Sequence, residues 1–355
     1  MTTQPIISQT LLIGSYADAP DEGIYTAKFD PKTGTLDSIR LVATEKNPSY
    51  LAISRSGKNV YAVNEESPGS FSRYAWNNDR SQLIKQENHT SDGAYPCYIS
   101  LNPSETKLAV ANYGGGNIAV YPLEETGKIG DTLISRKHQG SGPFMPNQES
   151  AHAHCATFDP SGTYLYAADL GIDEVLAYPV ISHEALGDAH IALQLNPGDG
   201  PRHIAINPTG HLVFIINELS STVVSAKLDS QNGIFKQIDR QSTLPENFDG
   251  KNACADIHLS SDGRYLYASN RGHNSIAVFA VAKDGSLNLL ETTAVEGDWP
   301  RNFTLSPDGM FLLVANQRSN NITVLLRDPE TGLLSYTGNS IEARQPVFLG
   351  FVKPN

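Results

Sequence analysis

The stretch GPRHIAINPTGHLVFIINE, residues 200–218, decides the fold of this chain. Two apolar runs, 203–206 and 212–216, flank a polar turn that contains Pro, Thr and Gly, which is the pattern of a β-hairpin. The second strand of an antiparallel hairpin returns to where the first began, so residues at the two outer ends become neighbours. The pattern therefore places Arg202 and Glu218 together at one end of one hairpin.

The turn of this hairpin recurs along the chain. Its six copies are SRSG (54–57), NPSE (102–105), DPSG (159–162), NPTG (207–210), SSDG (260–263) and SPDG (306–309). Their last residues are spaced by 48, 57, 48, 53 and 46 positions, and an Asn or Asp follows each of them after seven positions. Regular self-similarity at such a period indicates a repeat architecture.

Each hairpin is followed by a third short strand and usually by a fourth, more polar one. The predicted third strands are 70–76, 117–123, 174–180, 222–228, 275–281 and 321–327. The two ends of the chain supply the strands of one further unit. In blade order they are 345–352, 10–16, 23–30 and 36–44.

Pairing of the two termini in one sheet would close the ring and leave few open strand edges. We therefore predict an all-β fold, a seven-bladed β-propeller with four-stranded antiparallel blades, closed by pairing of the N- and C-terminal strands. No composition shift or long linker marks a second unit, so we expect residues 1–355 to form a single domain.

Composition excludes several function classes. A net charge of −12 argues against general nucleic-acid binding. No apolar run approaches the length of a membrane span, and the start MTTQPIISQT lacks the pattern of a signal peptide. Three cysteines cannot all pair, and nothing else indicates an oxidising compartment. We therefore expect a cytoplasmic protein that binds neither nucleic acid nor a membrane.

In such blades the start of strand one and the end of strand two lie on the same face of the ring. Eight positions before each last turn residue stand Ser49, Cys97, His154, Arg202, Ala255 and Arg301, with Val347 in the closing unit. Eight positions after it stand Glu65, Tyr113, Leu170, Glu218, Arg271 and Gln317. The mouth of the central channel should therefore gather His154, Arg202, Arg271, Arg301 and Glu218. The longest loops, 138–154 and 242–256, belong to the same face, where long loops often carry binding sites.

This predicted cluster of arginine and histidine stands out in an acidic protein. Arginine binds carboxylate or phosphate through paired hydrogen bonds, so we expect a small anionic ligand. Glu218 is the carboxylate placed to move a proton.

Three further residues are candidates for contact with the substrate. His152 lies in the loop that precedes His154. His203 should point away from the channel and between blades, as a hydrogen-bonded core histidine or as a substrate contact. Asp256 and His258, two apart on one strand, form either a catalytic dyad or a buried network that joins two blades, with Asp256 as a reserve general base.

Four segments resemble the lactonase family of seven-bladed propellers. They are GPRHIAINP (200–208), INELSSTV (216–223), ADIHLSSDGRYLYASNR (255–271) and PRNFTLSPDG (300–309), and the resemblance extends over essentially the whole chain. It implies a reaction that opens or forms a lactone, with no required metal or other cofactor. It also implies an active-site set of His154, Arg202, Glu218 and Arg271. The positions of four further residues in the blades make them candidate substrate contacts: Arg301, His152, His203 and Asp256.

The leading hypothesis is hydrolysis of a small anionic lactone, 6-phosphogluconolactone, in carbohydrate metabolism and the pentose phosphate pathway, by a monomer or weak homo-oligomer. The alternatives are another sugar-lactone hydrolase, a cycloisomerase that acts on a carboxylated muconate, a metal-dependent propeller of the gluconolactonase type, and a scaffold that binds proteins. The sequence does not decide among these reactions.

Overall fold

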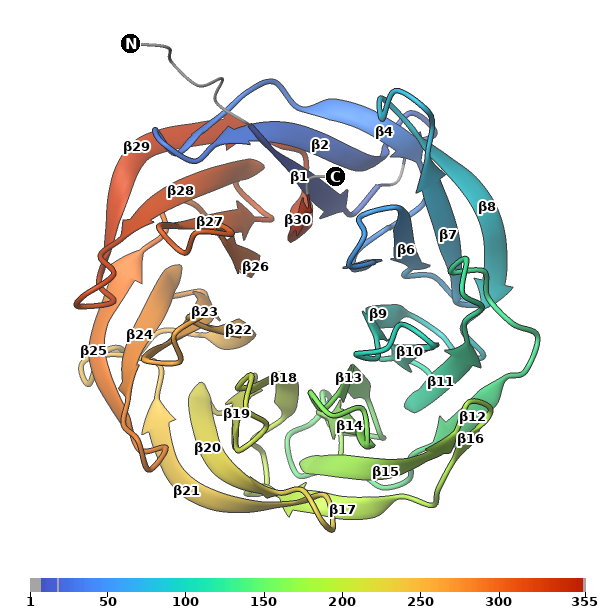
Figure 1. The fold of residues 1–355 in the computed structure, drawn as a ribbon. Helices are drawn as coiled ribbons and strands as arrows, with labels where there is room; N and C mark the ends of the chain where they lie inside the picture. Colours follow the sequence, from blue (N-terminus) through green and yellow to red (C-terminus); the bar gives the residue numbers. More distant parts are fainter. Residues whose placement is uncertain (1–7, 18, 354–355) are drawn as a thin grey trace.

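The computed structural model describes residues 8–17 and 19–353, and within them every regular element is a β-strand. Seven antiparallel sheets stand in a ring, each with its first strand nearest the central axis (Figure 1). This arrangement confirms the predicted seven-bladed propeller.

The closing sheet joins the two ends of the chain. It contains β30 (Pro346–Val352), β1 (Gln9–Ser15) and β2 (Gly23–Asp30), with β3 (Thr35–Leu36) and β4 (Arg40–Thr44) both paired to β2. The antiparallel pairing of β1 with β30 runs from Thr10 opposite Val352 to Ser15 opposite Pro346. The predicted closure of the ring by the terminal strands is therefore confirmed.

The other six sheets follow one another along the chain. The second and third contain β5 (Leu51–Ile53), β6 (Asn59–Asn64), β7 (Ser70–Trp76) and β8 (Leu83–Thr90), then β9 (Pro96–Leu101), β10 (Lys107–Asn112), β11 (Asn117–Pro122) and β12 (Ile134–Lys137). The fourth contains β13 (Ala153–Phe158), β14 (Tyr164–Asp169), β15 (Glu174–Ser182), β16 (Ala185–Leu186) and β17 (His190–Gln194). The fifth contains β18 (Pro201–Ile206), β19 (Leu212–Asn217), β20 (Thr222–Asp229) and β21 (Ile234–Ser242).

The last two sheets complete the ring. They contain β22 (Ala253–Leu259), β23 (Tyr265–Arg271), β24 (Ser275–Val281) and β25 (Leu287–Ala294), then β26 (Pro300–Leu305), β27 (Phe311–Asn316), β28 (Asn321–Arg327) and β29 (Leu334–Glu342). Among the third strands, β7, β24 and β28 match the predicted ranges residue for residue.

The hydrophobic core lies between neighbouring blades. Leu11 and Phe29 of the closing sheet, for example, pack in one cluster with Leu313 and Val324 of the last sheet. Each fully buried side chain of this size stabilises the fold by about 1.5–3 kcal/mol. A blade buries its apolar faces only against its neighbours, so the stability of each blade depends on the blades beside it. No helix of the described residues is long and apolar enough to cross a membrane.

Six of the seven innermost strands, all except β5, share an irregularity that positions the site. Near the start of β18, Pro201 pairs with Asn217 but His203 pairs with Ile216, so the ladder skips Arg202. Such a β-bulge sets two residues of one strand against one of the other and re-aims the extra side chain. The residues skipped in this way are Cys97, His154, Arg202, Arg301 and Val347, with Ala255 and Asp256 in β22. These bulges therefore fall on the residues predicted to open the mouth face.

Candidate active site

Glu218 lies between two arginines at one end of the ring. Its Oε2 atom is 3.0 Å from Arg202 Nε and 2.8 Å from Arg271 Nη2. Glu218 follows the end of β19, Arg202 is the bulged residue of β18, and Arg271 ends β23 in the next blade. The predicted neighbourhood of Arg202, Glu218 and Arg271 is thus present in the structure, and we refer to this end of the ring as the mouth.

Backbone carbonyls hold both arginines in place. Arg202 Nη1 donates to Ala255 O at 2.6 Å. Arg271 donates from Nε to Ala253 O at 3.1 Å and from Nη2 to Cys254 O at 2.8 Å. Since these carbonyls all belong to β22, its irregular start fixes the direction of both guanidinium groups before any ligand arrives.

The charges around Glu218 keep it ionised. Its side chain is only 15% exposed. Burial opposes ionisation, but the positive charges of Arg271, Arg202 and Arg301 outweigh it and hold the pKa of Glu218 below its ordinary value. Burial lowers the pKa of Arg271 to about 10, so this group stays protonated at neutral pH. The cluster is therefore a carboxylate between two cations.

Arg301, the bulged residue of β26, stands at the same mouth and forms no ion pair with the residues that the structure describes. Its Cζ atom lies 5.2 Å from the centre of the Tyr16 ring. The Tyr16 hydroxyl donates to both carboxylate oxygens of Glu65 at 3.0 Å, and the Ser49 hydroxyl also donates to Glu65. Burial would lower the pKa of Arg301, but Tyr16, Glu65 and Glu218 together raise it.

Tyr16 and Glu65 also lie at the mouth beside Arg301, although the sequence pattern suggested no role for either residue. Glu65 occupies the same place in its blade as Glu218, one residue after the second strand. Tyr16 follows β1 in the same way, so it is the seventh member of that set. Alignment of the terminal unit with the six internal ones would have found Tyr16.

His154 lies in the mouth as a neutral imidazole. Its Nδ1 atom is 3.6 Å from Cys97 Sγ, and its ring meets Tyr113 and His203 edge-on at 5.5 Å. Burial, followed by Arg202, His203 and Arg301, holds the pKa of His154 well below its ordinary value. Within the described residues, no hydrogen bond joins His154 to Glu218.

His152 contacts Tyr113, which lies beside the cluster. Its Nδ1 atom donates to Tyr113 O at 2.9 Å, and the two rings stack at 4.5 Å. Its backbone N–H donates to Asp169 Oδ1 at 2.7 Å. Burial and the charge of Glu218 raise the pKa of Tyr113 to about 12, so its hydroxyl stays protonated beside the cluster.

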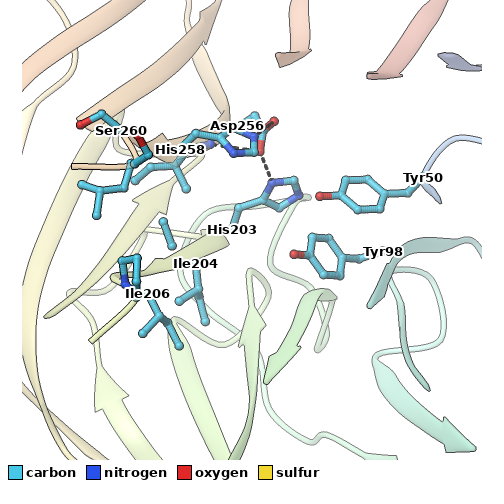
Figure 2. Close-up of a pocket in the computed structure, with 13 residues that line it drawn as sticks. Tyr50, Tyr98, His203, Ile204, Ile206, Asp256, His258 and Ser260 are labelled. Carbon is cyan, nitrogen blue, oxygen red and sulfur yellow. Dashed lines mark hydrogen bonds and ion pairs between the residues drawn. The ribbon is translucent and has the colours of Figure 1, made fainter. Parts of the chain in front are cut away.

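The prediction that His203 points away from the channel is wrong. Its ring faces the central axis and meets Tyr98 at 5.2 Å and Tyr50 at 5.8 Å (Figure 2). The cause is the bulge at Arg202, because an extra residue breaks the strict alternation of side chains along a strand. His203 and the two tyrosines form an aromatic layer directly beneath the arginine cluster.

Asp256 lies in a buried network, which supports that interpretation over a catalytic dyad. It accepts hydrogen bonds from His203 Nδ1 at 2.8 Å and from His258 Nε2 at 2.9 Å, and also from Asn302 Nδ2. These donors come from three blades. Tyr50, His203, Asp256 and His258 also line a cavity of about 320 Å³ that reaches the tight turns on the other face (Figure 2).

The tautomer of His203 follows from its two contacts. Arg202 Nη1 lies 3.2 Å from His203 Nε2, and a guanidinium can only donate. His203 Nε2 must therefore accept, and the proton on Nδ1 points to Asp256. Burial and Arg202 lower the pKa of His203 to about 4, so the ring is neutral at pH 7.

The described residues contain no group of three or more His, Cys, Asp or Glu that could hold a metal ion. The cysteines Cys97, Cys155 and Cys254 are buried and free. The expectation that the reaction needs no metal or cofactor stays a prediction.

Comparison with known proteins agrees with the fold. The family described as "Lactonase, 7-bladed beta-propeller" matches residues 10–351. A 6-phosphogluconolactonase of Bacillus subtilis is 32% identical over 342 residues, which are 96% of this chain and 97% of the relative. A 6-phosphogluconolactonase of Formosa agariphila is 35% identical over 335 residues, 91% of this chain and 94% of the relative.

Solved structures extend the likeness to three dimensions. The periplasmic gluconolactonase PpgL of Pseudomonas aeruginosa has a TM-score of 0.92 at 33% identity, over 98% of this chain and 99% of that one. A putative 6-phosphogluconolactonase of Bacteroides fragilis has a TM-score of 0.89 at 34% identity, over 99% of this chain and 100% of that one. This chain therefore belongs to the lactonase family of seven-bladed β-propellers, and its enzyme class is that of a lactone hydrolase.

Proposed function

We propose that this protein hydrolyses 6-phosphogluconolactone to 6-phosphogluconate. The observation that carries the proposal is the ionised Glu218 held between Arg202 and Arg271 at the mouth. Relatives that bear the name of this activity, at 32% and 35% identity over nearly the full chain, support the choice of substrate.

In this proposal Glu218 acts as the general base. Both arginines contact Oε2, so we assign Oε1 to the attacking water. Glu218 takes one proton of the water while its oxygen adds to the lactone carbonyl. The tetrahedral intermediate then breaks its bond to the ring oxygen, which receives the proton from Glu218 and becomes the hydroxyl of the sugar acid.

Arg202 and Arg271 would stabilise the negative charge on the former carbonyl oxygen. Their directions are set in advance by the carbonyls of β22, so little reorganisation is needed as the charge develops. The loss of one such preorganised donor costs about 3–4 kcal/mol of barrier. His154, neutral and close to Arg202, is assigned to a hydroxyl group of the substrate or, through a bridging water, to the proton route.

A second candidate is hydrolysis of the unphosphorylated gluconolactone. The P. aeruginosa structure that carries this activity in its name supports it. The two substrates differ only in the phosphoryl group, so the same chemistry at Glu218 would serve both.

The test is hydrolysis of freshly generated 6-phosphogluconolactone by the wild type and by Glu218→Gln, with and without EDTA. We expect turnover that EDTA does not change and that falls about 10²–10⁴-fold in the variant, the usual contribution of a general base. Glu125→Gln, at an exposed loop position, is the matched control. A Glu218→Gln enzyme as fast as the wild type would remove Glu218 from the mechanism, and a rate no higher than spontaneous ring opening would remove the substrate.

The cytoplasmic location and the monomeric or weakly oligomeric state belong to the same proposal. Three buried free thiols fit a reducing compartment, where cysteines stay unpaired.

A further inference from the structure

We infer that Arg301 receives the phosphoryl group of the substrate and thereby makes the enzyme selective for phosphorylated lactones. This inference rests on the proposed function. It also gives Arg301, which the sequence pattern placed among the substrate contacts, a specific role distinct from those of Arg202 and Arg271.

The first argument is the supply of hydrogen-bond donors. Arg202 and Arg271 each form an ion pair with Glu218, and each donates hydrogen bonds to carbonyls of β22. Arg301, by contrast, makes no hydrogen bond or ion pair with any residue in 8–17 or 19–353. Its guanidinium group forms a cation–π contact with the face of the Tyr16 ring. A guanidinium has five N–H donors, and a half-buried one without acceptors is costly to the fold.

The second argument is that the nearest acid is kept away from Arg301. Glu65 acts electrostatically on Arg301, yet the two side chains form no ion pair. Its carboxylate instead accepts from the hydroxyls of Tyr16 and Ser49. Because Glu65 accepts from these neutral hydroxyl groups, the guanidinium group of Arg301 keeps its N–H donors available for a ligand.

The third argument is the charge of the substrate before the reaction. An intact sugar lactone has no carboxylate, so the phosphoryl group is the only anionic part of 6-phosphogluconolactone. A phosphate monoester offers several oxygens to a planar guanidinium and forms paired, charge-assisted hydrogen bonds with it. Arg301 is the bulged residue at the start of β26, as Arg202 is in β18, so the two side chains belong to the same mouth. The charge of Arg301 also helps to lower the pKa of Glu218 and of His154. A lactone bound at Glu218 could therefore extend its phosphoryl group to Arg301.

The experiment compares 6-phosphogluconolactone with δ-gluconolactone in the wild type, Arg301→Met and Arg301→Lys. For Arg301→Met we expect kcat/KM to fall about 100-fold or more on the phosphorylated lactone, chiefly through KM, and by less than about twofold on the other. Arg301→Lys should retain part of the binding, because lysine keeps the charge but loses the paired geometry. Arg40→Met, at an exposed position at the start of the outer strand β4, removes the same charge far from the cluster and should leave the hydrolysis of both substrates unchanged.

An equal loss on both lactones, or no loss on either, would overturn the inference. If the wild type hydrolyses neither lactone, the proposed function fails, and calorimetric titration with 6-phosphogluconate then tests Arg301 alone. Binding that disappears in Arg301→Met would support the anion site, and binding that persists, or that is absent from the wild type, would refute it. Competition by inorganic phosphate in the wild type needs no variant; it should raise KM for the phosphorylated lactone only.

Discussion

Replacement of Asp256 by asparagine tests the network that links the mouth to the centre of the ring. The variant keeps the shape of the side chain but removes the charge and turns one acceptor oxygen into a donor. His203 Nδ1, His258 Nε2 and Asn302 Nδ2 all donate to Asp256 in the native protein. After the change, at least one of these donors faces an NH₂ group and stays unsatisfied.

The size of the effect on stability follows from this accounting. Removal of one partner from a buried, charged hydrogen-bonded pair costs about 3–5 kcal/mol. Unfolding entropy near 60 °C is about 2.1 cal/mol/K per residue, which for 355 residues is roughly 0.75 kcal/mol/K. A loss of about 4 kcal/mol should therefore lower the melting temperature by roughly 5 °C.

The same change should slow the reaction through Arg202. Asp256 holds the proton on His203 Nδ1, and this leaves Nε2 free to accept from Arg202 Nη1. Without the carboxylate, His203 can carry its proton on Nε2, where it meets the guanidinium donor to donor. The resulting shift of Arg202 should lower kcat by about 10–100-fold, the range expected for a displacement near 1 Å.

Thermal unfolding and steady-state kinetics at 25 °C measure the two effects separately. Asp308→Asn, in an exposed tight turn of another blade, controls for the substitution itself. An Asp256→Asn protein with an unchanged melting temperature would refute the energetic argument. A lower melting temperature with an unchanged kcat would refute the link from His203 to Arg202, and Asp256 would then be only a structural residue.

Three further predictions concern the ion cluster. The pKa of Glu218 lies below its ordinary value, so kcat/KM should hold steady as the pH falls toward about 4.3, the ordinary pKa of Glu, and decline only below that pH. Arg271→Met removes the largest charge that favours the ionised carboxylate, so it should move this decline to higher pH. A pH profile that does not move in this variant would exclude Glu218 as the titrating base. The ionised Glu218 also contributes stability above its unfolded pKa, and this contribution should disappear as the pH falls through the lower folded pKa, as acid unfolding of wild type and Glu218→Gln would show. Arg202→Ala should reduce kcat about 10²–10³-fold. Its effect on the free energy of unfolding should be smaller, because Arg271 still pairs with Glu218. A variant with normal turnover would contradict the catalytic role of Arg202.

The sequence alone was enough to determine the architecture. Turn residues at a regular period mark the hairpins, and apolar runs between them mark the inner strands, because both depend on local chemistry. The repeat then assigned equivalent positions in each blade, so Arg202, Glu218 and Arg271 could be brought together without coordinates. Closure by the terminal strands followed from the missing strands of the seventh unit.

Only the tertiary structure decided what each mouth residue contacts and which charge it carries. The direction of His203 depends on a bulge, and a bulge is a property of two paired strands rather than of one segment. The partnership of Tyr16 with Glu65 depends on how the closing sheet packs beside the next blade, because the two residues belong to different sheets. The ionised state of Glu218 and the open guanidinium of Arg301 depend on burial and on competing charges from several blades, and these long-range terms have no local sequence signal.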